Sequence, residues 1–248
     1  MRRTHCIPFR FPGLNGVQCL FSTRIAHNES GEPVSGNLAR TVPGGEREAD
    51  AAVAGLQEEY GIGAWCETRQ VHGTDISFLE DFTETNIPPT GDALATNLAD
   101  RALVIKVADC QPVLLAHASG GAVAALHVGW RANRENAPGI WTRAFCERYG
   151  LDPRDVYAVR GPSLSPQRSE FVHFEREWGD AFLDYFHPGR RTVDLWRLTR
   201  DQLTQAGIPK ENVFGLDLCT YSLPELFFSH RRSGDTERQA GLIWIRNE

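Results

Sequence analysis

Three apolar runs in the middle of the chain constrain its fold more than any other feature. Their sequences are ALVIKVA (102–108), PVLLA (112–116) and AVAALHV (122–128). Strands with apolar side chains on both faces are typical of sheets that are covered on both sides. The connections between these runs are short, so at least part of the sheet is predicted to be antiparallel.

The rest of the chain alternates between strand and helix patterns. Further strands are predicted at 17–23, 156–160, 213–218 and 239–245, and helices at 46–63, 138–149, 172–186 and 193–207. Residues 28–45 are predicted to form a long loop, and 64–72 with 75–80 a hairpin around Gly73. The pattern predicts an α+β protein with one domain over residues 1–248, a mixed sheet system covered by helices.

Composition places the chain among soluble globular proteins. It has 248 residues, 41% of them hydrophobic, and a formal net charge of -6, which argues against a basic nucleic-acid-binding face. From the residue pattern we expect neither a signal peptide nor a transmembrane helix. Its six cysteines are scattered without a C-x-x-C pair, so we expect free thiols in the reducing cytoplasm.

Three metal-capable side chains stand at or near the ends of predicted strands. They are His72 in QVHG, Cys110 in ADC and His127 in HVGWR. Two imidazoles and one thiolate suit zinc, and three protein ligands leave a fourth position for water or substrate. Cys110 lies 38 positions after His72 and His127 another 17 on, which matches no short metal signature. The pattern leaves open that Cys110 is a small buried hydrophobe and the histidines structural.

Two charged residues beside these ligands are candidates for catalysis. Asp109 precedes Cys110, and on extended backbone the two side chains point to opposite faces. Asp109 then either holds a neighbouring loop or a histidine ligand, or it moves a proton. Arg131 follows His127 closely and either binds a phosphate or carboxylate or makes a surface ion pair.

Several segments together resemble a known family. In chain order they are FSTR (21–24), GNLA (36–39), QVHG (70–73), GDALAT (91–96), ADCQPVLL (108–115), HVGWRA (127–132), GPSLSP (161–166), DLCT (217–220) and FFSHRRSGDTERQ (227–239). This set resembles the laccase-domain family, also called the multicopper polyphenol oxidase or peptidoglycan editing factor family. The resemblance extends over nearly the whole chain, and the order QVHG, ADC, HxGWR is highly specific.

The resemblance implies a fold, a metal and an activity. The implied fold is α+β, with mixed sheets layered between helices. One zinc ion per chain would be bound by His72, Cys110 and His127. Members of the family are zinc-dependent enzymes that cleave adenosine, inosine or methylthioadenosine with phosphate and deaminate adenosine. Bacterial members are also linked to removing wrongly built cell-wall precursors. A purine nucleoside and phosphate are therefore the expected small-molecule partners.

Candidate substrate contacts follow from this expectation. Arg24 and Arg131 are candidates to bind the phosphate, and Asn37 and Gln70 are candidate polar contacts. Each has a structural alternative: Asn37 as a loop or cap residue, Gln70 as a strand-surface residue. In the last motif, Ser229, Arg231, Arg232 and Arg238 either bind an anion or belong to a solvated basic edge strand.

The sequence departs from the family pattern outside the three ligands. The usual GGVS is replaced by IAHNESGEPVSG, WRG becomes WRA at Ala132, GPCIGPCCYEV becomes GPSLSPQRSEFV, and TGR becomes TER with Glu237. These changes fall in segments predicted to be loops that shape the pocket. They therefore bear on the identity of the substrate more than on the metal.

Copper oxidase chemistry does not fit the composition. A blue multicopper oxidase needs about ten histidines, largely as H-x-H pairs, and a type 1 site with a cysteine and usually a methionine. This chain has eight histidines, no H-x-H and only the initiator methionine. Copper is thus less expected than zinc.

Two further hypotheses remain beside the nucleoside enzyme. One is an editing hydrolase that cleaves an amide in a nucleotide-linked muropeptide precursor. The other is a non-catalytic zinc protein, which requires a fourth protein ligand such as Cys219 or His230.

Overall fold

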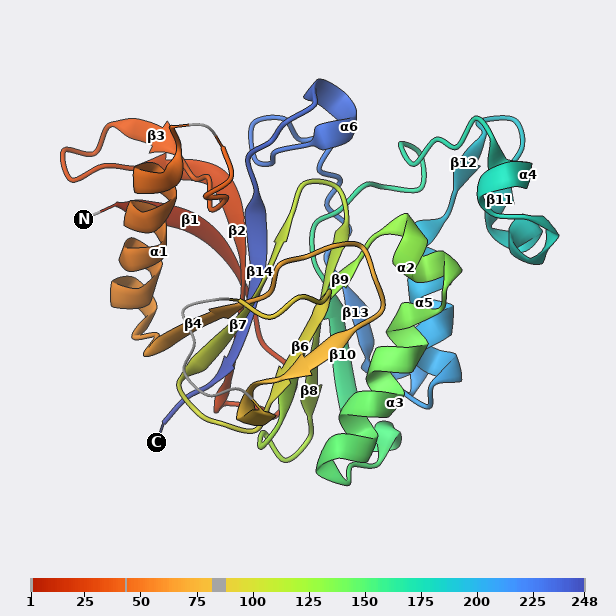
Figure 1. Cartoon of the computed structure of the whole chain (residues 1–248), viewed down its shortest axis with the longest axis horizontal. Coiled ribbons are helices and arrows are strands. Elements are labelled where there is room, and N and C mark those ends of the chain that lie inside the picture. The colour runs from red at the N-terminus through yellow and green to blue at the C-terminus, as the bar shows by residue number, and fades with distance from the viewer. Residues whose placement is uncertain (1, 43, 82–87, 248) are drawn as a thin grey trace.

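The central apolar runs form strands inside a stack of two β-sheets (Figure 1). The computed structural model describes residues 2–42, 44–81 and 88–247. Within these residues the strands make two six-stranded sheets and a two-stranded ribbon. The first sheet has the order β1 (Arg3–Phe9), β2 (Val17–His27), β14 (Gln239–Ile245), β7 (Arg101–Val107) and β4 (Ala64–Glu67), with β3 (Pro33–Ser35) paired to β2. The second has the order β13 (Val213–Gly215), β10 (Val156–Arg160), β8 (Gln111–His117), β9 (Val123–Val128), β6 (Ala93–Thr96) and β5 (Ile76–Phe78).

Helices cover the two outer faces of this stack. Helix α1 (Glu46–Tyr60) packs on the first sheet, and α3 (Ala137–Tyr149) and α5 (Leu195–Gln205) pack on the second (Figure 1). The short helices are α2 (Trp130–Arg134), α4 (Phe174–Glu177) and α6 (His230–Ser233), and the ribbon consists of β11 (Phe186–His187) and β12 (Thr192–Val193). The α+β class, with mixed sheets layered between helices, is confirmed. No helix among the described residues is long and apolar enough to cross a membrane.

Strand β7 shows why the apolar runs are continuous. Its residues Leu103 and Ile105 belong to the core between the two sheets, whereas Ala102 and Val104 belong to the core under α1. Alternate side chains of a strand point to opposite faces, so the part of a strand that has a core on each side carries apolar residues at consecutive positions, here 102–105. The predicted burial on both faces is confirmed.

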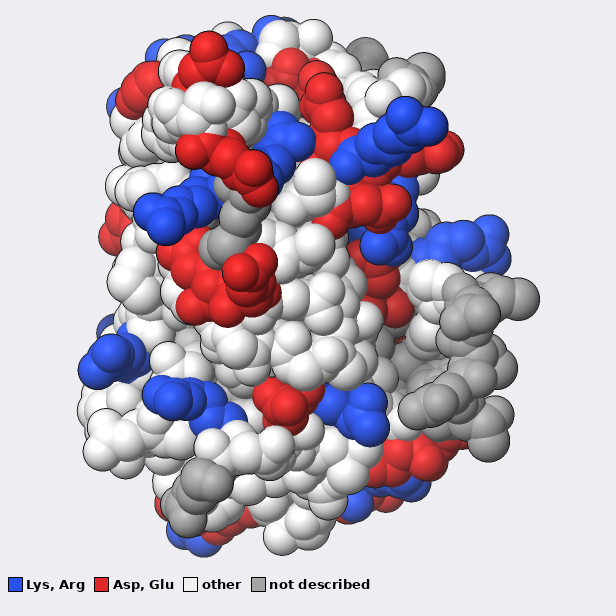
Figure 2. Space-filling model, turned by 90° about the vertical axis from the view of Figure 1, so that its left-hand side faces the viewer, with Lys and Arg blue, Asp and Glu red and all other residues white. Residues whose placement is uncertain are grey.

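Helix α1 follows the amphipathic pattern of its sequence. Its buried residues are Ala49, Ala52, Val53, Gly55 and Leu56. It ends where Gly61 adopts a left-handed conformation, with φ of 64°. Figure 2 looks onto this side of the molecule and shows acidic and basic side chains interspersed over the surface.

The predicted hairpin around Gly73 is wrong. Strand β4 pairs parallel with β7 in the first sheet, and β5 pairs parallel with β6 in the second. The intervening loop therefore carries the chain from one sheet to the other. The side chain of Asp92 holds this loop, because its carboxylate accepts hydrogen bonds from the backbone N–H groups of residues 71, 72 and 73.

The predicted helix over 172–186 is also wrong. Only α4 and a 3-10 turn at Asp180–Tyr185 form there, and Phe186 already belongs to β11. Gly179 lies between them with φ of 79°, a conformation that interrupts a helix. Elsewhere, β1 and β3 are strands that the sequence pattern did not predict, and β13 is shorter than the predicted 213–218. β3 lies in the predicted 28–45 loop, of which residue 43 is outside the described residues.

Two crossovers between the sheets meet at one edge of the stack. The chain passes from β4 to β5 and from β7 to β8, each time from the first sheet to the second. Because β4 and β7 are parallel neighbours, both strands end at the same edge. Strand β14 starts there too, since Gln239 lies opposite Val107 in an antiparallel pair. This edge therefore gathers loops that are far apart in the sequence.

Replacing Gly55 by alanine tests the packing of α1. A Cβ at this position would overlap the carbonyl oxygen of Arg2, the residue that leads into β1. Alanine favours a helix by about 1 kcal/mol over glycine, but overpacking costs about 1–3 kcal/mol. We expect Gly55→Ala to lower the free energy of unfolding in a denaturant titration. Glu58→Ala, at an exposed position of the same helix, should change it by no more than about 0.5 kcal/mol.

Candidate metal centre

His72, Cys110 and His127 converge at the edge where the crossovers meet. His72 comes from the β4–β5 loop, Cys110 from the β7–β8 crossover, and His127 from the last residues of β9. Their ligand atoms all lie within 4.8 Å of one another, and Cys110 Sγ is 3.8 Å from His72 Nε2. The grouping predicted from three separate motifs thus forms a site that could hold a metal ion.

Asp92 orients both histidines. Its fully buried carboxylate accepts a hydrogen bond from His127 Nδ1 at 2.7 Å, as well as those from the backbone of the His72 loop. A proton on Nδ1 leaves the lone pair of Nε2 available to a metal ion. Burial raises the pKa of Asp92, but the hydrogen bonds from His127 and Gly73 outweigh burial and lower the pKa below its ordinary value. Sequence reasoning missed Asp92, although it lies in the GDALAT motif directly before a strand.

The surroundings of Cys110 favour the thiolate form, which is the form that binds metal ions. Burial raises its pKa, but the neighbouring His127 and His72 more than compensate and lower the pKa to about 6. Burial lowers the pKa of His127, and Cys110 and Asp92 raise it to about 9. The two groups thus favour a thiolate beside an imidazolium. A metal cation takes the place of that proton, because metal ligands must be deprotonated.

The backbone around the ligands is unusual and tightly held. His72 and Asp109 have φ of 60° and 94°, in the left-handed region that non-glycine residues rarely occupy. Strained conformations of this kind cluster at functional sites. Gly129 leaves room for the ligands, because a Cβ there would lie 3.2 Å from both Cys110 Sγ and His72 Cδ2.

The donor set of this candidate site fits zinc. One thiolate and two imidazoles are ordinary zinc ligands, and catalytic zinc sites have three protein ligands. Among the described residues, no other His, Cys, Asp or Glu belongs to this group. Cys219, which the non-catalytic alternative offered as a fourth ligand, accepts a hydrogen bond from the backbone N–H of Ser165. His230, the other residue that this alternative offered, lines the same cavity but is not part of the group.

A cavity of about 970 Å³ opens beside the three ligands. Its apolar lining includes Trp130, Leu164, Phe171 and Leu195. Its basic lining consists of Arg40, Arg69, Lys106, Arg131, His230, Arg231 and Arg238. Clefts of 300–1,000 Å³ with an apolar lining and a few polar groups are typical of small-molecule sites.

The predicted substrate residues lie at this edge with different surroundings. Arg131 lines the cavity, with its guanidinium 4.5 Å above the ring of Trp130. Gln70 also lines it, but its amide is bonded to the backbone N–H and carbonyl of Lys106. Asn37 is buried and bonds to the backbone of Ala39 and Arg238.

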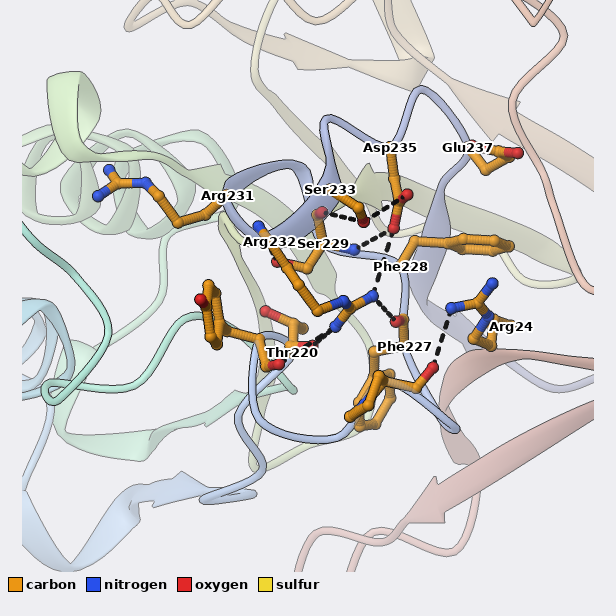
Figure 3. Close-up of polar contacts among 12 residues, drawn as sticks. Arg24, Thr220, Phe227, Phe228, Ser229, Arg231, Arg232, Ser233, Asp235 and Glu237 are labelled. Carbon is orange, nitrogen blue, oxygen red and sulfur yellow. Dashed lines mark hydrogen bonds and ion pairs between the residues drawn. The ribbon is translucent and has the colours of Figure 1, made fainter.

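Arg24 lies outside the cavity lining. It donates to the carbonyl of Pro224 and its guanidinium lies 5.0 Å from the ring of Phe228 (Figure 3). Asn37 and Gln70 therefore make contacts with the backbone, in agreement with the structural roles that the sequence left open for them. Arg24 contacts the segment 224–228. Their substrate roles stay predictions.

Asp109 joins the metal site to the C-terminal segment. One carboxylate oxygen accepts from Thr220 Oγ1 at 2.7 Å and the other from the backbone N–H of Arg231 at 2.6 Å. The sequence left open whether Asp109 holds a neighbouring segment or transfers a proton. These contacts show that it holds a neighbouring loop. Proton transfer by Asp109 stays a prediction.

The predicted basic edge strand in 227–239 is wrong over most of its length. Residues 230–233 form α6, capped by Ser229 Oγ, which accepts from the N–H of Arg232, and ended by Gly234 with φ of 70°. Arg232 turns inward and donates to the carbonyls of Thr220 and Phe227 (Figure 3). The guanidinium of Arg232 thus stabilises the loop over residues 220–227. Arg231 points the other way (Figure 3).

Comparisons with known proteins assign the family. Residues 18–246 match the family described as multi-copper polyphenol oxidoreductase laccase, and the chain belongs to this family. The resemblance drawn from the motifs is confirmed.

Individual relatives share both sequence and fold. A Xylella fastidiosa protein named purine nucleoside phosphorylase is 34% identical over 187 residues, which cover 71% of this chain and 70% of the relative. An Escherichia coli protein named purine nucleoside phosphorylase YfiH is 32% identical over 189 residues, 73% of each chain. The crystal structure of a Neisseria meningitidis protein superposes with a TM-score of 0.83 at 26% identity and covers 98% of this chain and 99% of its own. That of YlmD from Geobacillus stearothermophilus gives 0.81 at 27%, covering 95% and 94%.

Removing the thiol tests whether Cys110 is a ligand. Cys110→Ala should lose most of its bound metal, because two imidazoles alone leave an incomplete site. The fold should lose only about 1 kcal/mol of stability, since a small side chain is removed. Cys146→Ala, in α3 and away from the site, should keep full metal content. Elemental analysis measures the metal content per chain of the two variants. Equal metal content in both would show that Cys110 is not a ligand.

Asp92→Asn tests the carboxylate that orients both histidines. The amide keeps the size of the side chain but loses the charge, and its NH₂ group faces N–H donors. Loss of such a partner typically reduces metal affinity about 10- to 100-fold. A competition titration with a chromophoric chelator measures this change. Asp75→Asn, exposed in the same loop, is the control and should bind metal like the unmodified protein. An unchanged affinity in Asp92→Asn would contradict the role of this carboxylate.

Proposed function

We propose that this protein is a zinc-dependent enzyme that acts on purine nucleosides. The observation that carries the proposal is the convergence of His72, Cys110 and His127 on the wall of a large cavity, with no fourth protein ligand among the described residues. The names of the relatives in Xylella fastidiosa and Escherichia coli support the substrate class.

Zinc is the metal that the donor set favours. The thiolate and imidazole ligands suit zinc, and the scarcity of histidine and methionine argues against a multicopper oxidase. When bound, zinc supplies Lewis-acid catalysis and lowers the pKa of a coordinated water toward about 7. Because Cys110 must stay reduced to bind a metal, the proposal also places the enzyme in the reducing cytoplasm.

The residues of the chain position the reactants for phosphorolysis. A phosphate oxygen forms a bond to the ribose C1′ while the C1′–N9 bond breaks, and its electron pair leaves with the purine, which takes up a proton. The products are ribose 1-phosphate and the free base. Trp130 and Phe171 offer aromatic surface for the base, and Arg131 offers a guanidinium for the phosphate. In adenosine deamination, water replaces the C6 amino group, which leaves as ammonia.

Product analysis tests this proposal. Zinc-loaded protein is incubated with inosine, adenosine or methylthioadenosine, with and without phosphate, and the products are separated by chromatography. We expect free base that depends on phosphate, and inosine formed from adenosine. Cys110→Ala should lose most of both activities. If no base and no inosine form, the nucleoside proposal fails. Release of a free amino acid from a nucleotide-linked muropeptide precursor would then favour the editing hydrolase.

A further inference from the structure

Two of the five arginines that line the cavity, Arg131 and Arg231, pack on aromatic rings. The guanidinium of Arg131 lies 4.5 Å above Trp130, and that of Arg231 lies 5.8 Å from Phe171. The two rings contact each other edge to face, with centroids 5.8 Å apart. Such cation–π contacts orient an arginine while leaving its N–H groups available. The two arginines, one from α2 and one from α6, are thus brought to the same aromatic platform.

These arginines differ from Arg40 and Lys106, two other basic residues of the cavity lining. Arg40 and Lys106 form ion pairs with Glu67. Arg131 and Arg231 have no carboxylate within ion-pair distance among the described residues. Arg231 uses only one nitrogen, Nη1, which donates to the carbonyl of Glu170. Both guanidinium groups therefore keep donors for a ligand.

We propose that Arg131 and Arg231 together bind a phosphate group, with Asp109 as the residue that positions Arg231. Guanidinium groups bind phosphate with paired N–H donors, a geometry that lysine does not offer. This inference deepens the proposed function: it names Arg231, in place of Arg24, as the partner of Arg131. The phosphate is either free inorganic phosphate or a phosphate carried by the nucleoside.

Asp109 connects this phosphate site with the metal site. Its carboxylate accepts the backbone N–H of Arg231 and the hydroxyl of Thr220, and the next residue in the chain is Cys110. The crossover that delivers the metal ligand thereby also fixes the start of α6. Figure 3 shows Arg231 directed away from the cluster of Ser229, Arg232 and Asp235. Arg232 therefore stabilises the loop, whereas its neighbour Arg231 lines the cavity.

Direct binding measurements test the proposal independently of turnover. Isothermal titration of the zinc-loaded protein with inorganic phosphate, a nucleoside 5′-monophosphate and the unphosphorylated nucleoside distinguishes the two sources of phosphate. Arg131→Gln and Arg231→Gln should each weaken binding of the phosphate-bearing probe by about tenfold or more, as expected for a charged hydrogen bond. Neither should change the affinity for the nucleoside by more than about twofold, because the lost donors face the phosphate.

Two further variants complete the test. Arg197→Gln is the matched control, since Arg197 also packs on an aromatic ring, Tyr185, and donates to a carbonyl, but lies outside the cavity lining. It should bind every probe like the unmodified protein. Asp109→Asn should weaken phosphate binding while metal content and nucleoside affinity stay unchanged.

Two outcomes overturn the proposal. One is that neither phosphate nor the monophosphate binds the unmodified protein. The other is that Arg131→Gln and Arg231→Gln bind both probes normally. Phosphate binding that depends on these arginines, in a protein that releases no base from any nucleoside, would instead refute the proposed function and support the phosphate site.

Discussion

The carboxylate of Asp92 holds the two histidines of the candidate metal centre at once, through one imidazole N–H and three backbone N–H groups. A buried carboxylate loses the hydration that stabilises its charge, and only such a set of donors compensates for that loss. The same contacts shape the β4–β5 loop in which His72 lies. The position of His72, the tautomer of His127 and the course of the chain between the sheets therefore depend on one side chain.

The architecture explains why a site forms at this edge of the stack. Parallel strands β4 and β7 end side by side, and both continue into the second sheet, so their crossovers lie next to each other. Strand β9 delivers His127 from the second sheet, where Pro112 of β8 lies opposite it. Sheets fix the backbone at these points and loops leave the side chains accessible. The candidate metal ligands thus combine rigid placement with access from the cavity.

Around this centre, arginine side chains differ in the contacts that they make. The guanidinium of Arg232 donates hydrogen bonds to backbone carbonyls. Arg131 and Arg231 instead pack on aromatic rings and line the cavity. An arginine whose donors are already bound stabilises a loop, and one with available donors can bind an anion. Composition and net charge do not separate these cases, since they count the residues without their partners.

The sequence by itself determined the apolar strands and most bounds of the predicted helices, because side-chain period is a local property of the chain. Motif order, through the family resemblance, made His72, Cys110 and His127 candidate ligands, and the structure brings these three residues together. It predicted a hairpin at 64–80 and a helix at 172–186, since periodicity cannot tell which sheet a strand joins or that Gly179 interrupts a helix. It also missed Asp92, whose importance lies in its contact with His127, 35 positions away. Tertiary structure alone decided which loops meet and which donors remain available, because these depend on contacts between residues that are distant along the chain.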